Sequence, residues 1–325
     1  MAVKFIDEIR NKAKQKNLKC AFPDAEDIRS IAAARTLADE KIARPVLVGN
    51  EAKISGIAKE NNIALDGIEI VDPEKSPLKD KFADMLYEKR KHKGMSKEEA
   101  AKTVLDPLYF GGFLLETDEI AACVGGNVSS TGNVLRAAIY SVGVAEGISI
   151  VSSYFIMVFP DRLLCFADCA VNPDPDAKQL ADIAISSAKN FQAVTGEKSR
   201  VAMLSFSTNG SADHPLVDKV KEATKLVKEK APEIPTDGEM QLDAAIISAI
   251  GERKFPGSEV AGKANVLVFP DLNAGNIGYK LTERLAGAEA VGPVVQGLKK
   301  PYCDLSRGCS ADDMVNVAAI CTLMA

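Results

Sequence analysis

Near the carboxyl end, the segment DLSRGCSADDMV, residues 304–315, gathers side chains that are able to carry out chemistry. It places Ser306 beside Arg307, and the carboxylate of Asp313 follows on the same segment. An arginine presents a planar, permanently charged group whose N–H donors suit phosphate oxygens. A carboxylate acts as a general base if burial raises its pKa, or if a nearby cation acidifies the group that it deprotonates. These residue types predict a site that binds an anion and moves a proton.

The same segment also has the pattern of a helix start. Ser310 followed by Asp313 has the spacing of a capping box, in which each side chain bonds to the other residue's backbone N–H group. A carboxylate used in this way would be a poorer base, so the two roles of Asp313 compete. Cys309 offers a covalent nucleophile as an alternative, but His92 and His214, its potential partners, are remote in the sequence.

A second candidate segment is GGNVSSTGNVLRAAIYSVG, residues 125–143, which follows a predicted strand and opens a predicted helix. Its glycines and small hydroxyl residues, Ser130 and Thr131 among them, predict backbone N–H groups that face a ligand. A helix amino terminus favours an anion there, and Arg136 follows within the first turns. The segment predicts a phosphoryl or carboxylate site, and the alternative is an ordinary loop with a surface arginine.

A third candidate segment, NAGNIGYKL, follows the predicted strand NVLVFPD and presents Tyr279 and Lys280. The carboxyl end of a strand is the favoured ligand position in an open α/β sheet. Binding and ordinary loop structure are equally compatible with this pattern.

Two further motifs do not meet the requirements of a nucleotide or metal site. GSEVAGKA approaches a P-loop, but Ala264 replaces the hydroxyl residue that would bind magnesium, and the segment precedes a strand. No G-x-G-x-x-G follows a predicted strand. Asp237, Glu239 and Asp243 in TDGEMQLDAA are metal-ligand types, but solvated acidic side chains are the expected structure, so we predict no metal site.

The elements that must position these residues are short apolar β-rich runs alternating with helical segments. The predicted strands form two sets: residues 19–24, 44–49, 68–72 and 119–126, then residues 147–160, 162–171, 200–207 and 265–271. Alternation of this kind is typical of parallel sheets covered by helices. We therefore predict an α/β fold of two doubly wound domains with mainly parallel sheets and the active site in the interdomain cleft.

The predicted boundary lies near Gly147, where the glycine-rich helix end SVGVAEG passes into the next strand. The last helix, starting at Ser310, is expected to return to the first domain. The predicted first domain is therefore discontinuous, residues 1–147 plus 295–325, and the second comprises residues 148–294.

Composition excludes several classes of protein. The chain has 325 residues and a formal net charge of -5 with interspersed signs, which argues against nucleic-acid binding. No apolar run reaches the roughly 18 residues of a membrane span, and the amino terminus has no signal-peptide core. Seven cysteines without a CxxC pair indicate reduced thiols and not a zinc site. We expect a cytoplasmic protein.

Long strings over almost the whole chain resemble the phosphate acetyltransferase (phosphotransacetylase) family. They are NVLRAAI, FADCAVNP, LSFSTNGSA, DGEMQLDAA, VFPDLNAGNIGYKL, GAEAVGPVVQGL and SRGCSADDMVNVAAI. The resemblance implies reversible transfer of acetyl between coenzyme A (CoA) and inorganic phosphate by a homodimer of the short form. It also implies no metal or further cofactor, because CoA is a substrate.

By position, the resemblance implies that Asp313 takes the proton from the CoA thiol. It assigns Arg307 to substrate binding and charge stabilisation, and it places Ser306 beside the reacting carbonyl. Our mechanistic hypothesis is a ternary complex with direct thiolate attack, in which Arg307 and Arg136 hold the phosphoryl oxygens and Ser306 assists the oxyanion.

The family's two other substrate arginines fall on Arg136 and, in YEKRKHKG, on Arg90, where Lys89 and Lys91 leave the register open by one residue. Tyr279 and Lys280 match residues that face the family's cleft. The alternatives are a phosphate butyryltransferase, a dehydrogenase of the isocitrate type, and a catalytically silent module that senses acetyl-CoA. Composition and spacing do not separate acetyl from butyryl, because one or two methylenes contribute only about 1–3 kcal/mol.

Overall fold

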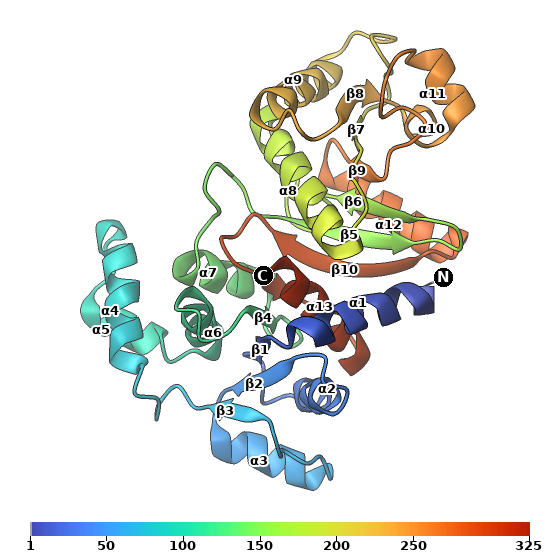
Figure 1. Cartoon of the computed structure of the whole chain (residues 1–325). Helices are drawn as coiled ribbons and strands as arrows, with labels where there is room; N and C mark the ends of the chain where they lie inside the picture. Colours follow the sequence, from blue (N-terminus) through green and yellow to red (C-terminus); the bar gives the residue numbers. More distant parts are fainter. Residues whose placement is uncertain (1) are drawn as a thin grey trace. The chain divides into compact units, whose positions relative to one another are not determined.

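The computed structural model describes residues 2–325 and divides into two compact units. The terminal unit comprises Ile6–Ala145 and Leu298–Ala325, and the central unit comprises Glu146–Gly297 together with the start of the first helix. Each unit has one sheet covered by helices (Figure 1). The predicted α/β fold with two mainly parallel sheets is confirmed.

The terminal unit has a five-stranded sheet in the order β11-β4-β1-β2-β3, and every neighbouring pair is parallel. Its strands are β1 (Lys19–Phe22), β2 (Arg44–Val48), β3 (Glu69–Val71), β4 (Ala122–Gly125) and β11 (Tyr302–Asp304). Strands β1, β2 and β4 are short apolar runs with almost every side chain buried, as expected for a sheet covered on both faces.

Helices cover both faces of this sheet (Figure 1). Helix α13 (Ala311–Met324) packs on α2 (Ile28–Asp39), and α6 (Pro107–Glu116) packs on α7 (Thr131–Ser141). The remaining helices of this unit are α1 (Ala2–Lys16), α3 (Glu51–Glu60), α4 (Lys79–Arg90), the 3-10 helix η1 (Lys91–Lys93) and α5 (Lys97–Thr103). Helix α13 is buried along most of its length, more completely than the amphipathic pattern predicted, because it packs on β4 and on α2.

Three phenyl rings fix α4 against α6. The ring centroid of Phe82 lies 5.0 Å from that of Phe110 and 5.6 Å from that of Phe113, and all three side chains are fully buried. Burying one such side chain contributes about 1.5–3 kcal/mol to folding. This packing determines where the carboxyl end of α4, with Arg90, lies within the terminal unit.

The central unit has a six-stranded sheet in the order β10-β5-β6-β9-β7-β8. Strands β6, β9, β7 and β8 are parallel, and β5 is antiparallel to both of its neighbours. The strands are β5 (Ser152–Val158), β6 (Leu163–Ala167), β7 (Val201–Leu204), β8 (Thr236–Met240), β9 (Val266–Val268) and β10 (Glu289–Gln296). The helices are α8 (Ala177–Thr195), α9 (Pro215–Lys230), α10 (Leu242–Ile246), α11 (Ser248–Lys254) and α12 (Leu272–Ala286).

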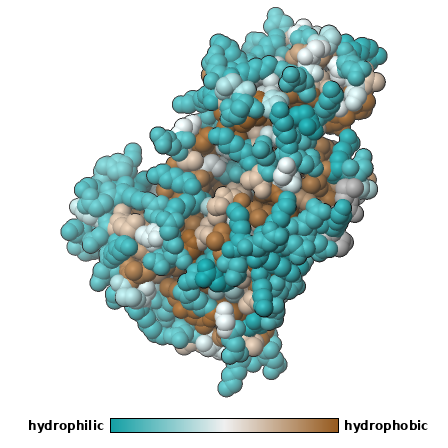
Figure 2. All heavy atoms as spheres, viewed as in Figure 1, coloured by the Kyte–Doolittle hydropathy of each residue, from teal (hydrophilic) through white to brown (hydrophobic). Residues whose placement is uncertain are grey.

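Three features of the structure match what the composition predicts: the hydrophilic surface, the lack of a membrane-spanning helix among the described residues, and the free thiols. Hydrophilic residues cover most of the visible face in Figure 2. In the part of the chain that the structure describes, no helix has both the length and the apolar character needed to cross a membrane. All seven cysteines are buried with free thiols, as the sequence predicts.

Candidate active site

The carboxyl ends of three neighbouring strands bring the candidate segments of the terminal unit to one edge of its sheet. Strand β4 lies between β1 and β11, and all three are parallel. The chain continues from β1 to β2 on one side of the sheet, whereas β4 and β11 lie on the other side. This is a topological switch point, the usual ligand position in an open α/β sheet. Ser306 and Arg307 follow β11 there, and the loop of residues 126–130 follows β4.

Asp24, two residues after the end of β1, organises the loop of residues 126–130. Its Oδ2 accepts hydrogen bonds from the amides of Gly126 at 2.8 Å, Val128 at 3.3 Å and Ser129 at 3.3 Å. Its Oδ1 accepts from the Ser129 hydroxyl at 2.7 Å. The prediction that these amides face a ligand is therefore wrong for these three residues, because a carboxylate of the protein already occupies them. Sequence reasoning missed Asp24, which lies about a hundred residues earlier in the chain.

The first turn of α7 remains open to a ligand. Ser130 caps the helix by accepting a hydrogen bond from the Asn133 amide, and a Cβ placed on Gly132 would meet no atom within 4 Å. Within residues 2–325, the amides of Thr131 and Gly132 make no hydrogen bond. Arg136, farther along α7, is exposed and forms no ion pair with a described residue. The helix start therefore retains the donors and the positive charge that an anion requires.

Asp304, the last residue of β11, is a buried carboxyl group that sequence reasoning missed. Its side chain bonds to Thr131, while Oδ1 has no partner among the described residues. A Cβ on Gly126 would lie 2.2 Å from this Oδ1, and the φ of Gly126 is 98°, so only glycine fits here. Burial raises the pKa of Asp304 to about 6, despite the hydrogen bond from Thr131.

Replacing Asp304 with asparagine is expected to stabilise the protein at pH 8. The pKa of Asp304 in the folded state, about 6, lies above its value of 3.8 in the unfolded chain, so folding favours the protonated form. The wild type therefore loses stability as the pH rises from about 4 through 6, by up to about 3 kcal/mol in total. Denaturant unfolding should show a more stable variant at pH 8, and the gain should shrink toward pH 4.

Asp84→Asn removes an exposed carboxylate of the same unit and provides the control. A gain for Asp304→Asn that is the same at pH 5 and pH 8 would contradict the buried-charge account.

Ser306, Arg307 and Gly308 form an exposed turn after β11. The Gly308 amide donates to the Ser306 hydroxyl oxygen at 3.2 Å, and the Cys309 amide donates to the Ser306 carbonyl at 2.9 Å. Because the Ser306 hydroxyl accepts in the turn, its own hydrogen is left to donate. The Arg307 side chain forms no ion pair or hydrogen bond within the described part of the chain.

Asp313 caps α13 with only one of its two carboxylate oxygens. Its Oδ2 accepts from the Ser310 amide and from the Ser310 hydroxyl, both at 2.8 Å, and the Asp313 amide donates to that hydroxyl at 3.1 Å. The predicted capping box is present. Oδ1 makes no hydrogen bond to a described residue, and the side chain is exposed. Capping therefore leaves one oxygen of Asp313 able to accept a proton.

Cys309 is poorly suited to covalent catalysis. The residue is only 8% exposed, and burial raises the pKa of its thiol above the usual value, against the opposing effect of the Arg29 charge. A thiol of raised pKa contains little of the nucleophilic thiolate at neutral pH.

Arg90 ends α4 and stacks on an aromatic ring of α7. Its guanidinium carbon lies 3.7 Å from the ring centroid of Tyr140, and the centroid of Tyr109 lies 6.2 Å from that of Tyr140. Lys89 instead forms an ion pair with Glu116 at 2.7 Å. Arg90 has no carboxylate partner among the described residues. Stacking fixes the plane of the Arg90 side chain and leaves its N–H groups to a ligand.

In the central unit, Tyr279 and Lys280 lie on α12, after the carboxyl end of β9. The half-buried Tyr279 ring stacks on Phe155 with centroids 4.3 Å apart, so this side chain contributes to packing. The exposed Lys280 ammonium donates to the Asn276 side chain at 2.8 Å. The structure thus places these two residues in a different unit from the other candidate site residues.

The three acidic residues of TDGEMQLDAA form no common metal site. Asp237 pairs with Lys228, Glu239 accepts from Ser207 and Gly210, and Asp243 pairs with Lys254. Across residues 2–325, no three His, Cys, Asp or Glu side chains converge as a set able to hold a metal ion.

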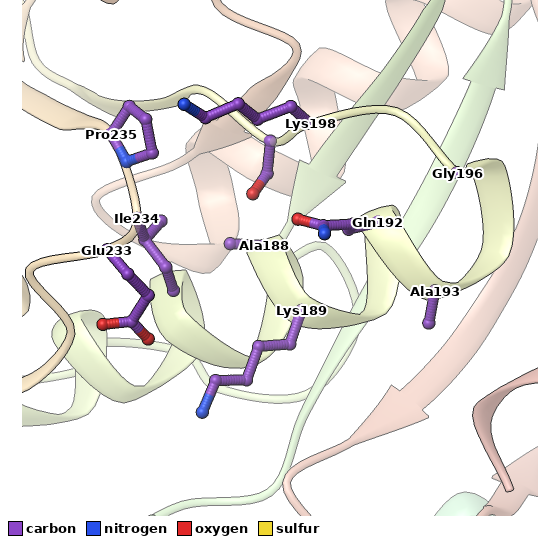
Figure 3. Close-up of a pocket in the computed structure, with 10 residues that line it drawn as sticks. Ala188, Lys189, Gln192, Ala193, Gly196, Lys198, Glu233, Ile234 and Pro235 are labelled. Atoms are coloured by element: carbon purple, nitrogen blue, oxygen red, sulfur yellow. The ribbon is translucent and has the colours of Figure 1, made fainter.

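A pocket of about 720 Å³ in the central unit contains none of the candidate site residues. Figure 3 shows Ala188, Lys189 and Gln192 of α8 on one side and Ile234 and Pro235 on the other. The pocket lies where β7 and β8 begin, at the opposite edge from the carboxyl ends that usually bind ligands.

Comparison with known proteins identifies the family. The family model described as phosphate acetyl/butaryl transferase matches residues 4–322. The chain belongs to this family. A phosphate acetyltransferase from Acetivibrio thermocellus is 47% identical over 327 residues, covering 99% of this chain and 98% of the relative. The resemblance inferred from the sequence is confirmed, and the protein is an acyltransferase.

Solved structures of the phosphate acetyl/butaryl transferase family have the same fold. A phosphotransacetylase from Streptococcus pyogenes superposes with a TM-score of 0.94 at 38% identity, covering 99% of this chain and 98% of that chain. A phosphotransacetylase from Staphylococcus aureus gives 0.92 at 40% identity, with the same coverage of both chains.

Proposed function

We propose that this protein is a phosphate acetyltransferase that transfers acetyl reversibly between CoA and inorganic phosphate. The observation that carries the proposal is the segment after β11, with an unpaired arginine, a serine whose hydrogen can donate, and a carboxylate with one oxygen left over. These groups suit, in turn, the phosphoryl oxygens, the carbonyl oxygen and the thiol proton of the reaction. The relative from A. thermocellus is a phosphate acetyltransferase by name, which supports acetyl as the transferred group.

In the proposed mechanism, CoA and acetyl phosphate bind together before any bond changes. Oδ1 of Asp313 takes the thiol proton, and the thiolate sulfur attacks the acetyl carbonyl. The new carbon–sulfur bond forms, the bond between the carbonyl carbon and the phosphate oxygen breaks, and phosphate leaves with that electron pair. Ser306 donates to the carbonyl oxygen, while Arg307 and Arg136 hold the phosphoryl oxygens. The reverse reaction follows the same steps backwards.

CoA carries several phosphate groups, and we propose that Arg90, Ser130 and Thr131 contribute to its binding. Arg90 fits the family's substrate arginine better than Lys89 does. The guanidinium of Arg90 is stacked and has no carboxylate partner among the described residues, whereas Glu116 already neutralises Lys89. Tyr279 and Lys280 remain proposed substrate-binding residues, and Lys280 is the better supported because its ammonium group is exposed.

Replacing Tyr140 with leucine is expected to raise KM for CoA about twofold to fivefold with a small effect on kcat. Leucine removes the ring on which Arg90 stacks, an interaction of about 0.5–1 kcal/mol at such a site. Tyr140→Phe keeps the ring and provides the matched control. Steady-state kinetics with varied CoA would contradict this account if both variants changed KM equally.

Phosphate-dependent release of free thiol from acetyl-CoA, compared with butyryl-CoA, tests the proposed function. We expect release with acetyl-CoA that depends on added phosphate and is at least about tenfold slower with butyryl-CoA. Equal or faster release with butyryl-CoA would favour the alternative, a phosphate butyryltransferase. No release with either substrate would favour a catalytically silent module that senses acetyl-CoA.

The proposed chemistry uses CoA as a substrate and needs no metal or further cofactor. We place the protein in the cytoplasm, because seven buried free thiols suit a reducing compartment. We propose neither a nucleic acid nor a membrane as a partner.

We propose a homodimer, supported by an apolar stripe on α12. Ile277, Leu281 and Leu285 recur every four residues and are 57%, 52% and 80% exposed in the single chain. Replacing both leucines with glutamate should convert the dimer to a monomer in light scattering, because each substitution would bury a charge. Arg284→Glu, on the same helix, provides the control. A double variant that stays dimeric would exclude this face.

A further inference from the structure

Arg29, in the first turn of α2, engages all five of its side-chain N–H donors. Nη1 donates to the carbonyls of Arg307 at 2.8 Å and Cys309 at 3.0 Å. Nη2 donates to the carbonyl of Asn127 at 2.8 Å and to Asp27 Oδ2 at 3.1 Å, and Nε donates to Asp27 Oδ1 at 2.9 Å. One guanidinium thus connects the turn after β11, the loop after β4 and the start of α2.

Asp27 fixes the plane and the charge of this guanidinium. Its carboxylate accepts two parallel bonds from Arg29 and also caps α2 through the Arg29 amide at 2.8 Å. The bond from the Arg29 side chain lowers the pKa of Asp27, so the carboxylate remains ionised near neutral pH. With its donors engaged and its charge neutralised, Arg29 is unsuited to binding a substrate anion, unlike Arg307 and Arg136.

Arg29 also provides the external support of the turn formed by residues 306–309. The other two bonds to the backbone of this turn, from Gly308 and Cys309 to Ser306, begin and end within it. Among the described residues, Arg29 is the only side chain outside the turn that bonds to its backbone. The position of the turn at the edge of the sheet therefore depends on these two contacts and on its covalent ends.

We propose that Arg29 is a positioning residue for the acyl transfer. It holds the backbone from which Ser306 and Arg307 extend at a fixed place relative to the loop that leads into α7. The inference rests on the proposed function, because that function makes these two side chains catalytic. A displacement of about 1 Å at a reacting centre can reduce a rate roughly a hundredfold. The side chain of Arg29 is 28% exposed, so water can satisfy the three carbonyls after truncation and the fold should persist.

Arg35 provides a matched control on the same helix. Its guanidinium likewise bonds two backbone carbonyls, those of Ala64 and Asp66, and one carboxylate, that of Asp39. These acceptors lie outside both candidate loops. Truncating Arg35 therefore removes a similar set of contacts from α2 without freeing the turn of residues 306–309.

The experiment compares Arg29→Ala, Arg29→Lys and Arg35→Ala by steady-state kinetics and by hydrogen exchange of the peptide spanning residues 306–309. We expect Arg29→Ala to lower kcat at least about a hundredfold with KM for CoA within about threefold of wild type. Exchange in that peptide should be at least about tenfold faster, which corresponds to about 1.4 kcal/mol of lost protection. Arg29→Lys should restore little of the lost kcat or exchange protection. Lysine lacks the planar guanidinium that reaches Asp27 and the three backbone carbonyls at once. Arg35→Ala should change neither measurement.

Unchanged exchange in Arg29→Ala would overturn the proposal, as would faster exchange with unchanged kcat. An equal loss of kcat in Arg35→Ala would mean that the loss in Arg29→Ala comes from general destabilisation of α2. That result would also overturn the proposed positioning role of Arg29. If the wild type itself released no thiol, the proposed function would fail. The exchange comparison would then decide by itself whether Arg29 holds the turn.

Discussion

Replacing Asp313 with asparagine is expected to lower kcat by two to four orders of magnitude, with little change in CoA binding or stability. Asparagine keeps one carbonyl oxygen, which can occupy the position of Oδ2 and accept both bonds from Ser310. Its amide nitrogen then takes the place of Oδ1 and cannot accept a proton. The substitution therefore removes the base and retains the cap, and general bases typically contribute about 10²- to 10⁴-fold.

Asp312→Asn provides the control for Asp313, because it removes the neighbouring exposed carboxylate from the same helix turn. It should keep kcat within about threefold of wild type. Asp313→Ala should lower kcat as asparagine does and also destabilise the fold by about 1 kcal/mol through loss of the cap. Pre-steady-state thiol release, CoA titration and thermal unfolding measure the three effects. Asp313→Asn with wild-type turnover would exclude Asp313 as the base.

Local sequence patterns predicted the parts of this protein that depend on neighbours in the chain. The capping box of Ser310 and Asp313 follows from spacing alone, and the apolar runs at 44–49 and 119–126 contain the largely buried strands β2 and β4, as expected. Whether the cap leaves an oxygen of Asp313 unused could not be predicted from spacing, because only the structure shows that Oδ2 alone makes the cap.

The sequence did not reveal groups that act over long distances in the chain. Asp24 binds amides about a hundred residues later, and Arg29 reaches carbonyls 278 and 280 residues later. Neither has a spacing signal, because strand order and not sequence brings them to the same edge. Solvated acidic side chains were expected at Asp237 and Glu239, but both lie on strand β8, where Asp237 pairs with Lys228 and Glu239 is buried.

These contacts divide the charged groups of the terminal unit into two classes. Asp24 and Arg29 form their hydrogen bonds with other groups of the protein, and these bonds hold the loops after β1, β4 and β11. Arg136 and Arg307 have no such partners among the described residues and retain their charge for a ligand. Full engagement predicts a structural role, and an exposed arginine without a partner predicts a binding role.

Replacing Arg307 with alanine is expected to lower kcat about 10²- to 10³-fold, a loss of about 2.7–4 kcal/mol of transition-state stabilisation. The substitution keeps the backbone carbonyl that Arg29 holds, so the turn should remain in place while the guanidinium is lost. Lysine should restore only a small part of the rate, because a single ammonium cannot hold two phosphoryl oxygens in the geometry of the planar fork.

Steady-state kinetics in both directions would show which substrate Arg307 binds. A group that acts on the phosphoryl oxygens should raise KM for phosphate, measured with acetyl-CoA, more than KM for CoA, measured with acetyl phosphate. Arg253→Ala, an exposed arginine on α11, should leave both constants near wild type. Hydrogen exchange of the 306–309 peptide should be unchanged in Arg307→Ala, whereas it should be faster in Arg29→Ala. Unchanged exchange would show that Arg307→Ala acts through the lost charge and not through a displaced turn. A turnover within threefold of wild type would exclude Arg307 from the reaction and leave Arg136 as the remaining candidate for the phosphoryl oxygens.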